Sequence, residues 1–319
     1  MTSDSAPGAS RTHLAIGLVL SVMLAFAVMD GLTKLLSQSL PITQILLFRS
    51  FVFALLAVAM LRVGPTAAAL PIRDVARSRR PWLQFSRALL LVIESGLFMI
   101  AFSLLPLADV HAVNAVAPLL VVALSVPFLG EAVGWRRWLA VGIGFVGVLI
   151  IVRPGLTAIQ PATLMALVGS AMWAVYQIMV RLCSRVDSNQ TTSLWTAFVG
   201  LGAAGIAGST SWVWPDAGGW ALLIAVALLG AYAHIAFISA LGMTEPSLLQ
   251  PFSYTLFVWA VVVGFALFGD VPDRWTLAGA SLIIASGLYA WYRERVRARR
   301  DRVSDLRRQE DVHEPRPDT

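Results

Sequence analysis

The stretch "SRALLLVIESGLFMIAF", Ser86 to Phe102, decides the fold because one carboxylate, Glu94, stands in the middle of an apolar run. A soluble core helix would turn Glu94 outward to water. A membrane helix would keep it inside the hydrocarbon layer, where an intramembrane charge is expensive and marks a functional site by default. The rest of the chain chooses between these two readings.

The composition favours the membrane reading. The 319 residues are 58% hydrophobic and 13% charged, with a mean hydropathy of +0.76, whereas a soluble domain has about 45–50% apolar and about 25% charged residues. The net charge of +6 predicts no nucleic-acid partner, because basic residues of membrane proteins set topology or contact anionic lipid. The single cysteine, Cys183, excludes an intrachain disulfide.

Apolar segments recur along the chain, each near the ~20 residues that cross a bilayer as a helix. We therefore expect an all-α polytopic membrane protein with ten transmembrane helices. They are placed at about 14–35, 42–61, 81–104, 107–129, 135–152, 162–182, 191–212, 220–241, 247–268 and 275–292.

Arginine placement predicts the orientation. With a cytoplasmic N-terminus, 19 of the 24 basic residues fall on the cytoplasmic side and three on the other side, as the positive-inside rule requires. We expect a multi-pass protein of the bacterial inner membrane with both termini in the cytoplasm. The charged tail, residues 293–319, is expected to be a solvated end; the alternative is that its arginines bind anionic lipid.

An internal repeat divides the chain. "GEAVGW" (130–135) matches "GDVPDRW" (269–275), and each tryptophan is followed twelve positions later by a glycine. "AFSLLPLAD" at 101 and "SVMLA" at 21 likewise resemble "AFISALGMTE" at 236 and "SAMWA" at 170. The predicted parts are a tail (1–13), a first five-helix repeat (14–152), a linker (153–161), a second repeat (162–292) and the charged tail. Two copies with an odd number of spans insert in opposite orientations, which places a substrate site near the midplane between them.

Here the chain resembles a known family. Two five-span halves, each closing with Gly-Glu or Gly-Asp before a glycine-bearing last helix, are similar to EamA-type members of the drug/metabolite transporter superfamily. The run "PFSYTLFVWAVVVGFALFGDVPDRWTLAGASLIIASGLY" is especially similar to bacterial members. The resemblance implies a secondary transporter working by alternating access on a small organic metabolite. Amino acids, vitamins such as riboflavin and nucleotide-like compounds such as S-adenosylmethionine are the candidates, and the state of assembly is left open between monomer and homodimer.

Glu94 is the first candidate site residue. It lies thirteen residues into its segment, about 20 Å along a helix and thus close to the midplane. Arg87 is two turns earlier on the same face, and His234 is one turn from the position that the repeat aligns with Glu94. We expect Glu94 to bind a cationic group or carry a coupling proton and His234 to relay protons. For both residues the alternative is a structural role between helices.

The remaining candidates are polar or aromatic groups inside the segments. Trp173, Tyr176, Gln177 and Tyr232 can stack on or bond a flat substrate, or else pack in the core. Asn114, Pro118, Gln250 and Pro251 lie on two segments that the repeat matches, and prolines there free backbone carbonyls that can line a pathway.

The remaining polar and small residues are expected to be mainly structural, and Asp30 and Lys34 are also candidates for gating. Asp30 and Lys34, four apart, predict an exposed ion pair or a gate, whereas Asp109 and His111 predict loop and cap chemistry. Glu131 and Asp270 belong to the Gly-acid turns. A small-residue stripe, Ala140, Gly144 and Gly147, predicts a close helix contact.

Signals of an enzyme are weak. The four histidines have no metal-ligand spacing, and the chain has no G-x-S-x-G elbow and no phosphate-binding P-loop. We therefore expect no enzyme activity, no metal and no cofactor. The alternatives are an intramembrane enzyme that uses Glu94 and His234, or a scaffold that transports nothing.

The first prediction concerns topology. Reporter fusions at Arg299 and near Thr157 should report opposite sides of the membrane, the first cytoplasmic and the second external, because five spans separate Thr157 from either tail. At each position, the measurement compares the activity of a fused alkaline phosphatase with the signal of a fused fluorescent protein. Equal location of both fusions would contradict the five-plus-five arrangement.

Overall fold

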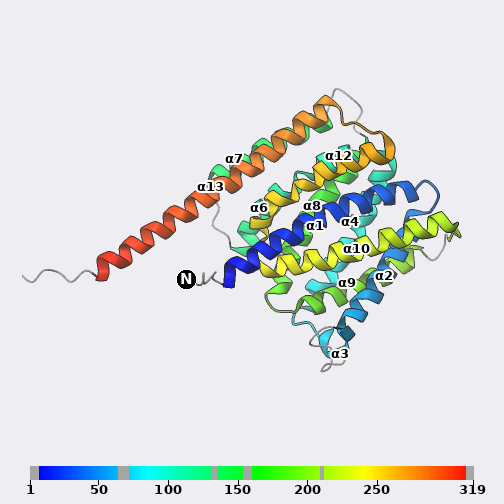
Figure 1. The fold of residues 1–319 in the computed structure, drawn as a ribbon, viewed down its shortest axis with the longest axis horizontal. Helices are drawn as coiled ribbons and strands as arrows, with labels where there is room; N and C mark the ends of the chain where they lie inside the picture. Colours follow the sequence, from blue (N-terminus) through cyan, green and yellow to red (C-terminus); the bar gives the residue numbers. More distant parts are fainter. Residues whose placement is uncertain (1–6, 64–71, 131–134, 154–159, 209–211, 314–319) are drawn as a thin grey trace, which may run out of the picture.

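The computed structural model describes residues 7–63, 72–130, 135–153, 160–208 and 212–313. Within these residues all regular structure is helical (Figure 1). The helices are α1 (Pro7–Leu36), α2 (Ile42–Val63), α3 (Ile72–Val75), α4 (Pro81–Leu104), α5 (Leu107–Asn114), α6 (Ala117–Leu129), α7 (Trp135–Val152), α8 (Pro161–Ser184), α9 (Asn189–Gly208), α10 (Ala217–Met243), α11 (Pro246–Ser253), α12 (Thr255–Phe268) and α13 (Arg274–His313).

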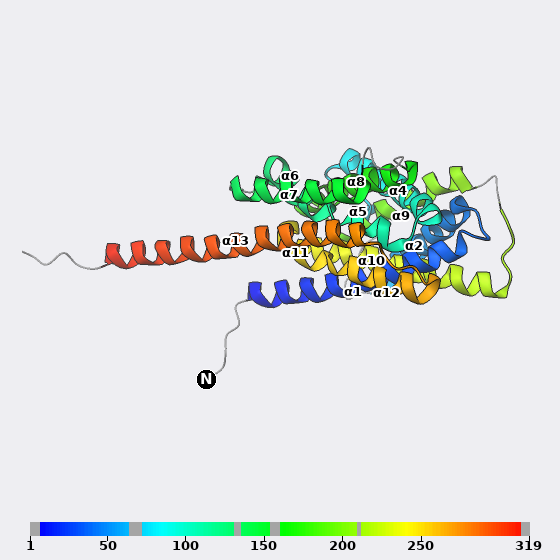
Figure 2. The same ribbon diagram turned by 90° about the horizontal axis from the view of Figure 1, so that it is seen from above.

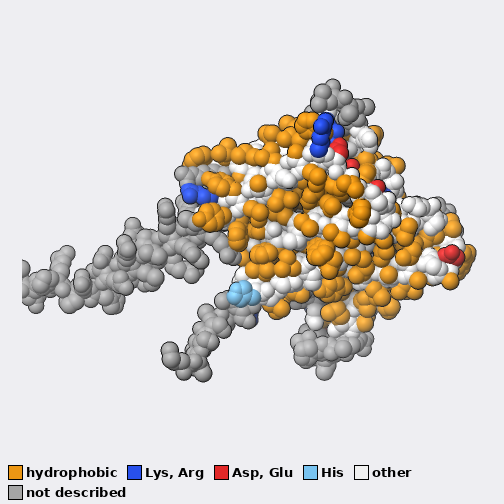
Figure 3. Space-filling view, turned by 45° about the horizontal axis from the view of Figure 1, so that its top comes forward, with side chains coloured by type: hydrophobic (Ala, Val, Ile, Leu, Met, Phe, Trp, Pro, Cys, Tyr) orange, Lys and Arg blue, Asp and Glu red, His pale blue; other side chains and the backbone are white. Residues whose placement is uncertain are grey.

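The helices have the length and the surface of a membrane protein. In the described part, seven segments are long and apolar enough to cross a bilayer, and Trp138–Val152 is apolar but shorter. Large apolar side chains such as Leu55, Phe145 and Val262 are exposed, and Figure 3 shows hydrophobic side chains over most of the visible face. Such a surface suits lipid rather than water, so the chain is a multi-pass membrane protein. The count of ten spans stays a prediction.

The two halves of the chain pack on each other in matched pairs. Helix α1 packs on α10, and its counterpart α8 packs on α4. Likewise α2 contacts α10 as α9 contacts α4, and α1 contacts α12 as α8 contacts α6, while α2–α9 and α7–α13 pair with their own counterparts. Exchanging the halves therefore reproduces the contact pattern. This is the contact pattern expected of two repeats that are related by a two-fold axis.

Both ends of the described chain lie at one end of the bundle. Figures 1 and 2 show α1 beginning and α13 ending on the same side. This side is called the N-terminal end below, and the opposite side, where α1 ends and α13 begins, is called the far end. The arrangement agrees with an even number of crossings.

Two matched crossings are broken in the middle. The segment 107–129 divides into α5 and α6 at Ala115 and Val116, and the segment 246–268 divides into α11 and α12 at Tyr254. Pro118 occupies the first turn of α6, and Pro251 lies inside α11. Proline has no backbone N–H and crowds the preceding turn. The predicted interruption of both crossings is therefore present, a few residues from each proline.

The predicted small-residue stripe makes a close contact between α7 and α13. A Cβ on Gly147 would lie 2.7 Å from the carbonyl oxygen of Gly279, and a Cβ on Gly279 would lie 2.6 Å from that of Gly147. The two backbones therefore touch without side chains between them, and Ala140 on the same stripe is buried. Glu131, in the first Gly-acid turn, lies outside the described residues.

The second prediction tests this contact. Gly147→Ala should destabilise the protein by about 1–3 kcal/mol, because an added methyl group in a well-packed contact forces the helices apart. Gly142→Ala on the same helix is the control, since its Cβ would meet nothing within 4 Å. The control should be neutral or slightly stabilising, as alanine favours a helix over glycine by about 1 kcal/mol. Thermal unfolding in detergent measures both; equal midpoints would contradict the contact.

Candidate functional site

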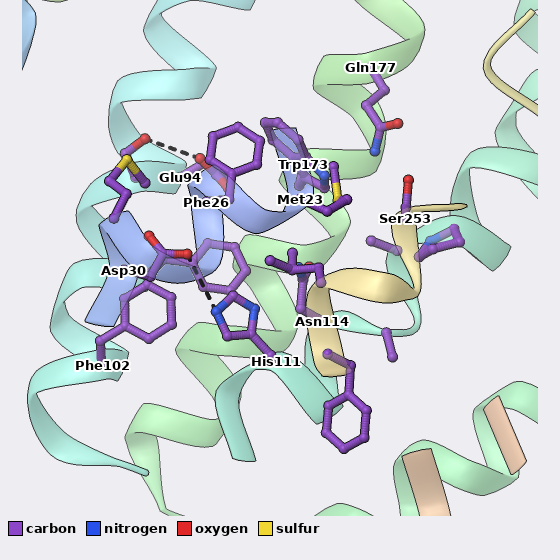
Figure 4. Close-up of a pocket in the computed structure, with 18 of the residues that line it drawn as sticks. Met23, Phe26, Asp30, Glu94, Phe102, His111, Asn114, Trp173, Gln177 and Ser253 are labelled. Carbon is purple, nitrogen blue, oxygen red and sulfur yellow. Dashed lines mark hydrogen bonds and ion pairs between the residues drawn. The ribbon is translucent and has the colours of Figure 1, made fainter. Parts of the chain in front are cut away.

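A cavity of about 810 Å³ lies between the two halves, near the middle of the bundle. Both halves line it, the first through α1, α2, α4, α5 and α6 and the second through α8, α10, α11 and α12. Figure 4 shows part of its wall. The polar residues that line it are Asp30, Arg49, Glu94, Ser95, His111, Asn114, Gln177, His234, Gln250, Ser253 and Tyr254.

Charged groups gather on one side of this cavity. Glu94 is 6% exposed, and its Oε2 accepts a hydrogen bond from Ser95 Oγ at 3.2 Å. Asp30 Oδ2 lies 3.4 Å from His111 Nε2, which is an ion-pair distance but a long one for a hydrogen bond. Figure 4 shows Asp30 and Glu94 on the same side of the cavity. Arg49 lines the same space from α2.

Aromatic rings form a second part of the wall. Trp173 stacks on Tyr176, with ring centroids 5.2 Å apart, and on Phe237 at 5.1 Å. The edge of Phe26 meets Trp173, and His234 meets the Phe26 ring at 5.2 Å. Such a cluster offers a flat, apolar surface on which an aromatic or heteroaromatic molecule can stack.

Amide and hydroxyl groups form the third part. Gln250 Nε2 donates to Gln177 Oε1 at 3.1 Å and to the carbonyl of Pro246. The buried oxygens Asn114 Oδ1, Gln250 Oε1 and Tyr254 Oη have no hydrogen-bond partner. Buried polar atoms are nearly always bonded to protein or water. Unsatisfied acceptors from both broken crossings therefore indicate a place for a ligand or ordered water.

Arg87 does not line this cavity and does not pair with Glu94 as its position two turns away had suggested. It is fully buried, and its Nη2 donates to Gln84 Oε1 and to the carbonyl of Thr192, each at 2.9 Å. Its guanidinium also lies over the Tyr176 ring, 5.6 Å from the centroid. These contacts join α4 to α8 and α9, so Arg87 holds helices together.

Three other predicted residues also lie away from the central cavity. Tyr232 is 46% exposed, and its hydroxyl lies 2.7 Å from Ser21 Oγ. Tyr176 is fully buried behind Trp173 and supports that ring. Pro251 lines a smaller adjoining cavity that shares Pro118, Gln250 and Tyr254 with the central one.

Asp30 and Lys34 do not form the predicted ion pair. Asp30 is buried and faces His111, whereas Lys34 Nζ lies 3.4 Å from Asp270 Oδ2 of the other half and donates to the carbonyl of Leu105. His111, which the sequence assigned to loop and cap chemistry, is 3% exposed and lines the cavity. That assignment is wrong because α5 enters the bundle and turns this side chain inward.

Polar contacts between the halves tie the far end. Besides Lys34 and Asp270, Thr276 donates to Asp109 at 3.0 Å, and Arg153 pairs with Asp273. Burial raises the pKa of Asp273, but the hydrogen bond from Arg153 and the Thr276 N–H outweigh it, so the pKa falls to about 2. The Asp273 carboxylate is therefore charged at neutral pH and can pair with Arg153.

A second set of contacts ties the N-terminal end. Asp187, between α8 and α9, accepts hydrogen bonds from Ser78 Oγ, from the Arg79 N–H and from Gln84 Nε2. Burial raises the pKa of Asp187. These hydrogen bonds and the charge of Arg79 outweigh burial, so the pKa lies below its ordinary value. Bonds that cross between the halves are thus present at both ends of the bundle.

Sequence reasoning missed Arg49 and the inward direction of His111. Arg49 carried a usable signal, since it is the only charged residue in the segment 42–61, and an intramembrane charge is a functional hypothesis by default. His111 carried no such signal, because its contact with Asp30 joins residues far apart in the sequence.

Comparison with known proteins gives consistent matches. The model of the EamA-like transporter family matches residues 13–153 and 160–291. A riboflavin transporter of Vibrio cholerae is 28% identical over 89% of this chain and 95% of that protein. An S-adenosylmethionine uptake transporter of Rickettsia bellii is 23% identical over 88% and 94%. A solved crystal structure shares the fold, with a TM-score of 0.62 at 19% identity over 88% of this chain and 95% of that one.

The third prediction tests whether the cavity admits water. In a Cys183→Ser background, Asn114→Cys and Gln250→Cys should react with a polar, charged thiol reagent, because both positions line the cavity. Val121→Cys is the matched control, since Val121 lies on the same crossing as Asn114, is fully buried and lines no described cavity. Mass spectrometry of the labelled protein measures the extent of reaction. Inertness of both cavity cysteines would rule out a wetted cavity.

Proposed function

The chain belongs to the EamA-like transporter family, and from that premise we propose that its substrate binds in the central cavity and crosses by alternating access between the two repeats. The chain is a transporter of small metabolites and not an enzyme, as its family and relatives are. The intramembrane enzyme and the inert scaffold considered from the sequence gain no support from either.

One observation carries the proposal: the cavity lies where the two halves meet, and side chains from both halves line it. Secondary transporters built from repeats hold their substrate at this place and expose it to either side by moving one half against the other. The lining also has the character of a small-molecule site, since apolar and aromatic side chains surround a few convergent polar groups.

The contacts at the two ends supply candidate gates. The pair Lys34–Asp270 and the bond from Thr276 to Asp109 join the halves at the far end, and Asp187 joins them at the N-terminal end. The side chains of Lys34 and Asp270 are 14% and 28% exposed, so water still reaches the pair, and an ion pair that water reaches is worth little, about 0–1 kcal/mol when fully exposed. Contacts this weak can break and re-form in each cycle, so we assign the gate at the far end to Lys34 and Asp270.

The lining of the cavity suggests the kind of substrate. Trp173 and Phe26 offer ring surfaces, and Asn114, Gln177 and Gln250 offer amide groups. We propose a small organic metabolite with a flat part, in the range of amino acids, riboflavin and S-adenosylmethionine. The named relatives from Vibrio cholerae and Rickettsia bellii carry two of these.

The proposed location is the bacterial inner membrane, with both termini in the cytoplasm. The arginine distribution supports this orientation, which makes the N-terminal end of the bundle the cytoplasmic end. Contact between the arginine-rich tail and anionic lipid remains a prediction from the sequence.

The fourth prediction concerns Glu94, which we assign to the coupling proton or to a cationic group of the substrate. Glu94→Gln should lower uptake into proteoliposomes, or abolish its dependence on pH, because glutamine keeps the shape but cannot titrate. Loss of a charge-assisted contact of about 1.5–3 kcal/mol corresponds to a rate or affinity lower by about tenfold to a hundredfold. Glu94→Asp should keep part of the activity, since its charge survives on a shorter stem.

Glu245→Gln is the matched control, because Glu245 is exposed ahead of α11 and lines no described cavity. It should transport at the wild-type rate. Wild-type transport with unchanged pH dependence in Glu94→Gln would make Glu94 a structural residue.

A further inference from the structure

Arg49 lies deep in the bundle and borders empty space on two sides. It comes seven residues after the start of α2, about 10 Å along the helix axis. It lines the central cavity and also a second cavity of about 460 Å³, and Ser95 and His234 are shared by the two. Its guanidinium therefore stands at the boundary between two cavities.

Arg49 has no bonded partner in the part of the chain that the structure describes. The carboxylates of Asp30 and Glu94 line the same cavity, yet neither forms an ion pair with Arg49 there, and no hydrogen bond of its side chain is present. Asp30 faces His111 and Glu94 is bonded to Ser95. A guanidinium has five N–H donors, so an unusual number of donors is left open.

The contrast with Arg87 shows how this protein treats a structural arginine. Arg87 is fully buried, bonds Gln84 and the carbonyl of Thr192, and lies over the Tyr176 ring. Two of the three guanidinium nitrogens of Arg87, Nε and Nη2, are bonded to protein, and its buried Nη1 has no hydrogen bond. Among the described residues the Arg49 side chain, at the cavity wall, has no hydrogen bond and no ion pair.

The position of Arg49 is closely defined on the protein side. A Cβ on Gly230 of α10 would lie 3.3 Å from Arg49 Nε and 3.1 Å from Met29 Sδ. The missing side chain of Gly230 thus leaves room for the guanidinium against the α10 backbone. The guanidinium is packed on that side and open toward the cavities.

A fixed guanidinium with open donors, next to a cavity, is suited to an oxyanion. The planar fork of N–H groups matches a carboxylate or phosphate in a bidentate arrangement. An unpaired charge inside the membrane is costly, and pairing with the ligand removes that cost. The nearby carboxylates of Asp30 and Glu94 repel any anion, but they repel a doubly charged phosphate more than a singly charged carboxylate, because the repulsion grows with the charge of the ligand.

We infer that Arg49 binds a carboxylate of the transported molecule, while Asp30 and Glu94 face a cationic group of the same molecule. The inference rests on the proposed function and narrows it, since it selects zwitterionic substrates over uncharged ones. Of the three classes proposed above, amino acids and S-adenosylmethionine fit, and riboflavin, which has no carboxylate, does not.

The test uses pairs of probes that differ by the carboxylate alone. Tryptophan is compared with tryptophan amide, and S-adenosylmethionine with its decarboxylated form, with riboflavin as the uncharged probe. Each is added at millimolar concentration to the purified full-length protein, and the rise in melting temperature reports binding. At least one carboxylate probe should raise the melting temperature, and its partner without the carboxylate should raise it far less.

Variants assign the effect to Arg49. Arg49→Gln should weaken binding of the carboxylate probe by about tenfold to a hundredfold and leave binding of its partner unchanged, whereas Arg49→Lys should recover part of the loss. Arg274→Gln removes the same charge from an exposed position outside the cavity and should bind as the wild type. The elution profile on size exclusion checks that each variant is folded.

Three results would overturn the inference: no carboxylate probe binds, the two members of a pair bind equally, or Arg49→Gln binds the carboxylate probe as the wild type does. Flux in proteoliposomes separates this failure from failure of the proposed function. A probe carried equally by wild type and Arg49→Gln leaves transport standing and removes the carboxylate site. A probe that binds through Arg49 but never crosses leaves the site standing and removes transport.

Discussion

A charge inside a hydrocarbon layer has to be compensated by the protein itself, and the arrangement of this molecule depends on that constraint. Asp30, Arg49 and Glu94 come from three different helices of the first half, yet all three line one cavity against the second half. Outside this cavity the membrane-facing surface is apolar. Bringing the two repeats together therefore places these groups at a cavity in which a ligand can meet all three.

The same constraint applies to the backbone, and it divides the bundle into two kinds of contact. Helices α7 and α13 are continuous and meet backbone to backbone at Gly147 and Gly279, so little space separates them there. The crossings α5–α6 and α11–α12 are broken where they border the cavity. Broken helices within a membrane are tolerated where protein or a water-filled cavity satisfies the freed groups. The closely packed pair α7–α13 thus lies away from the cavity, and the broken helices border it.

The polar contacts at the two ends complete this arrangement. Lys34–Asp270 at the far end and Asp187 with Gln84 at the other join opposite halves, and the Lys34 and Asp270 side chains are 14% and 28% exposed, so water still reaches that pair. Arg87, by contrast, is fully buried, and its bond to the carbonyl of Thr192 holds α4 to α9.

The sequence by itself determined the all-helical membrane fold and the family, because composition and apolar segment length carry both; the depth of Glu94 in the membrane stays a prediction from counting residues at 1.5 Å per step. It did not determine which way a side chain turns. Arg49 and His111 enter the cavity, whereas Arg87, Tyr232 and Lys34 take partners elsewhere. The rotation of a helix about its axis is set by packing against helices distant in the chain, such as α1 on α10. Only the tertiary structure decided that rotation, since an apolar helix in lipid has no polar face to reveal it.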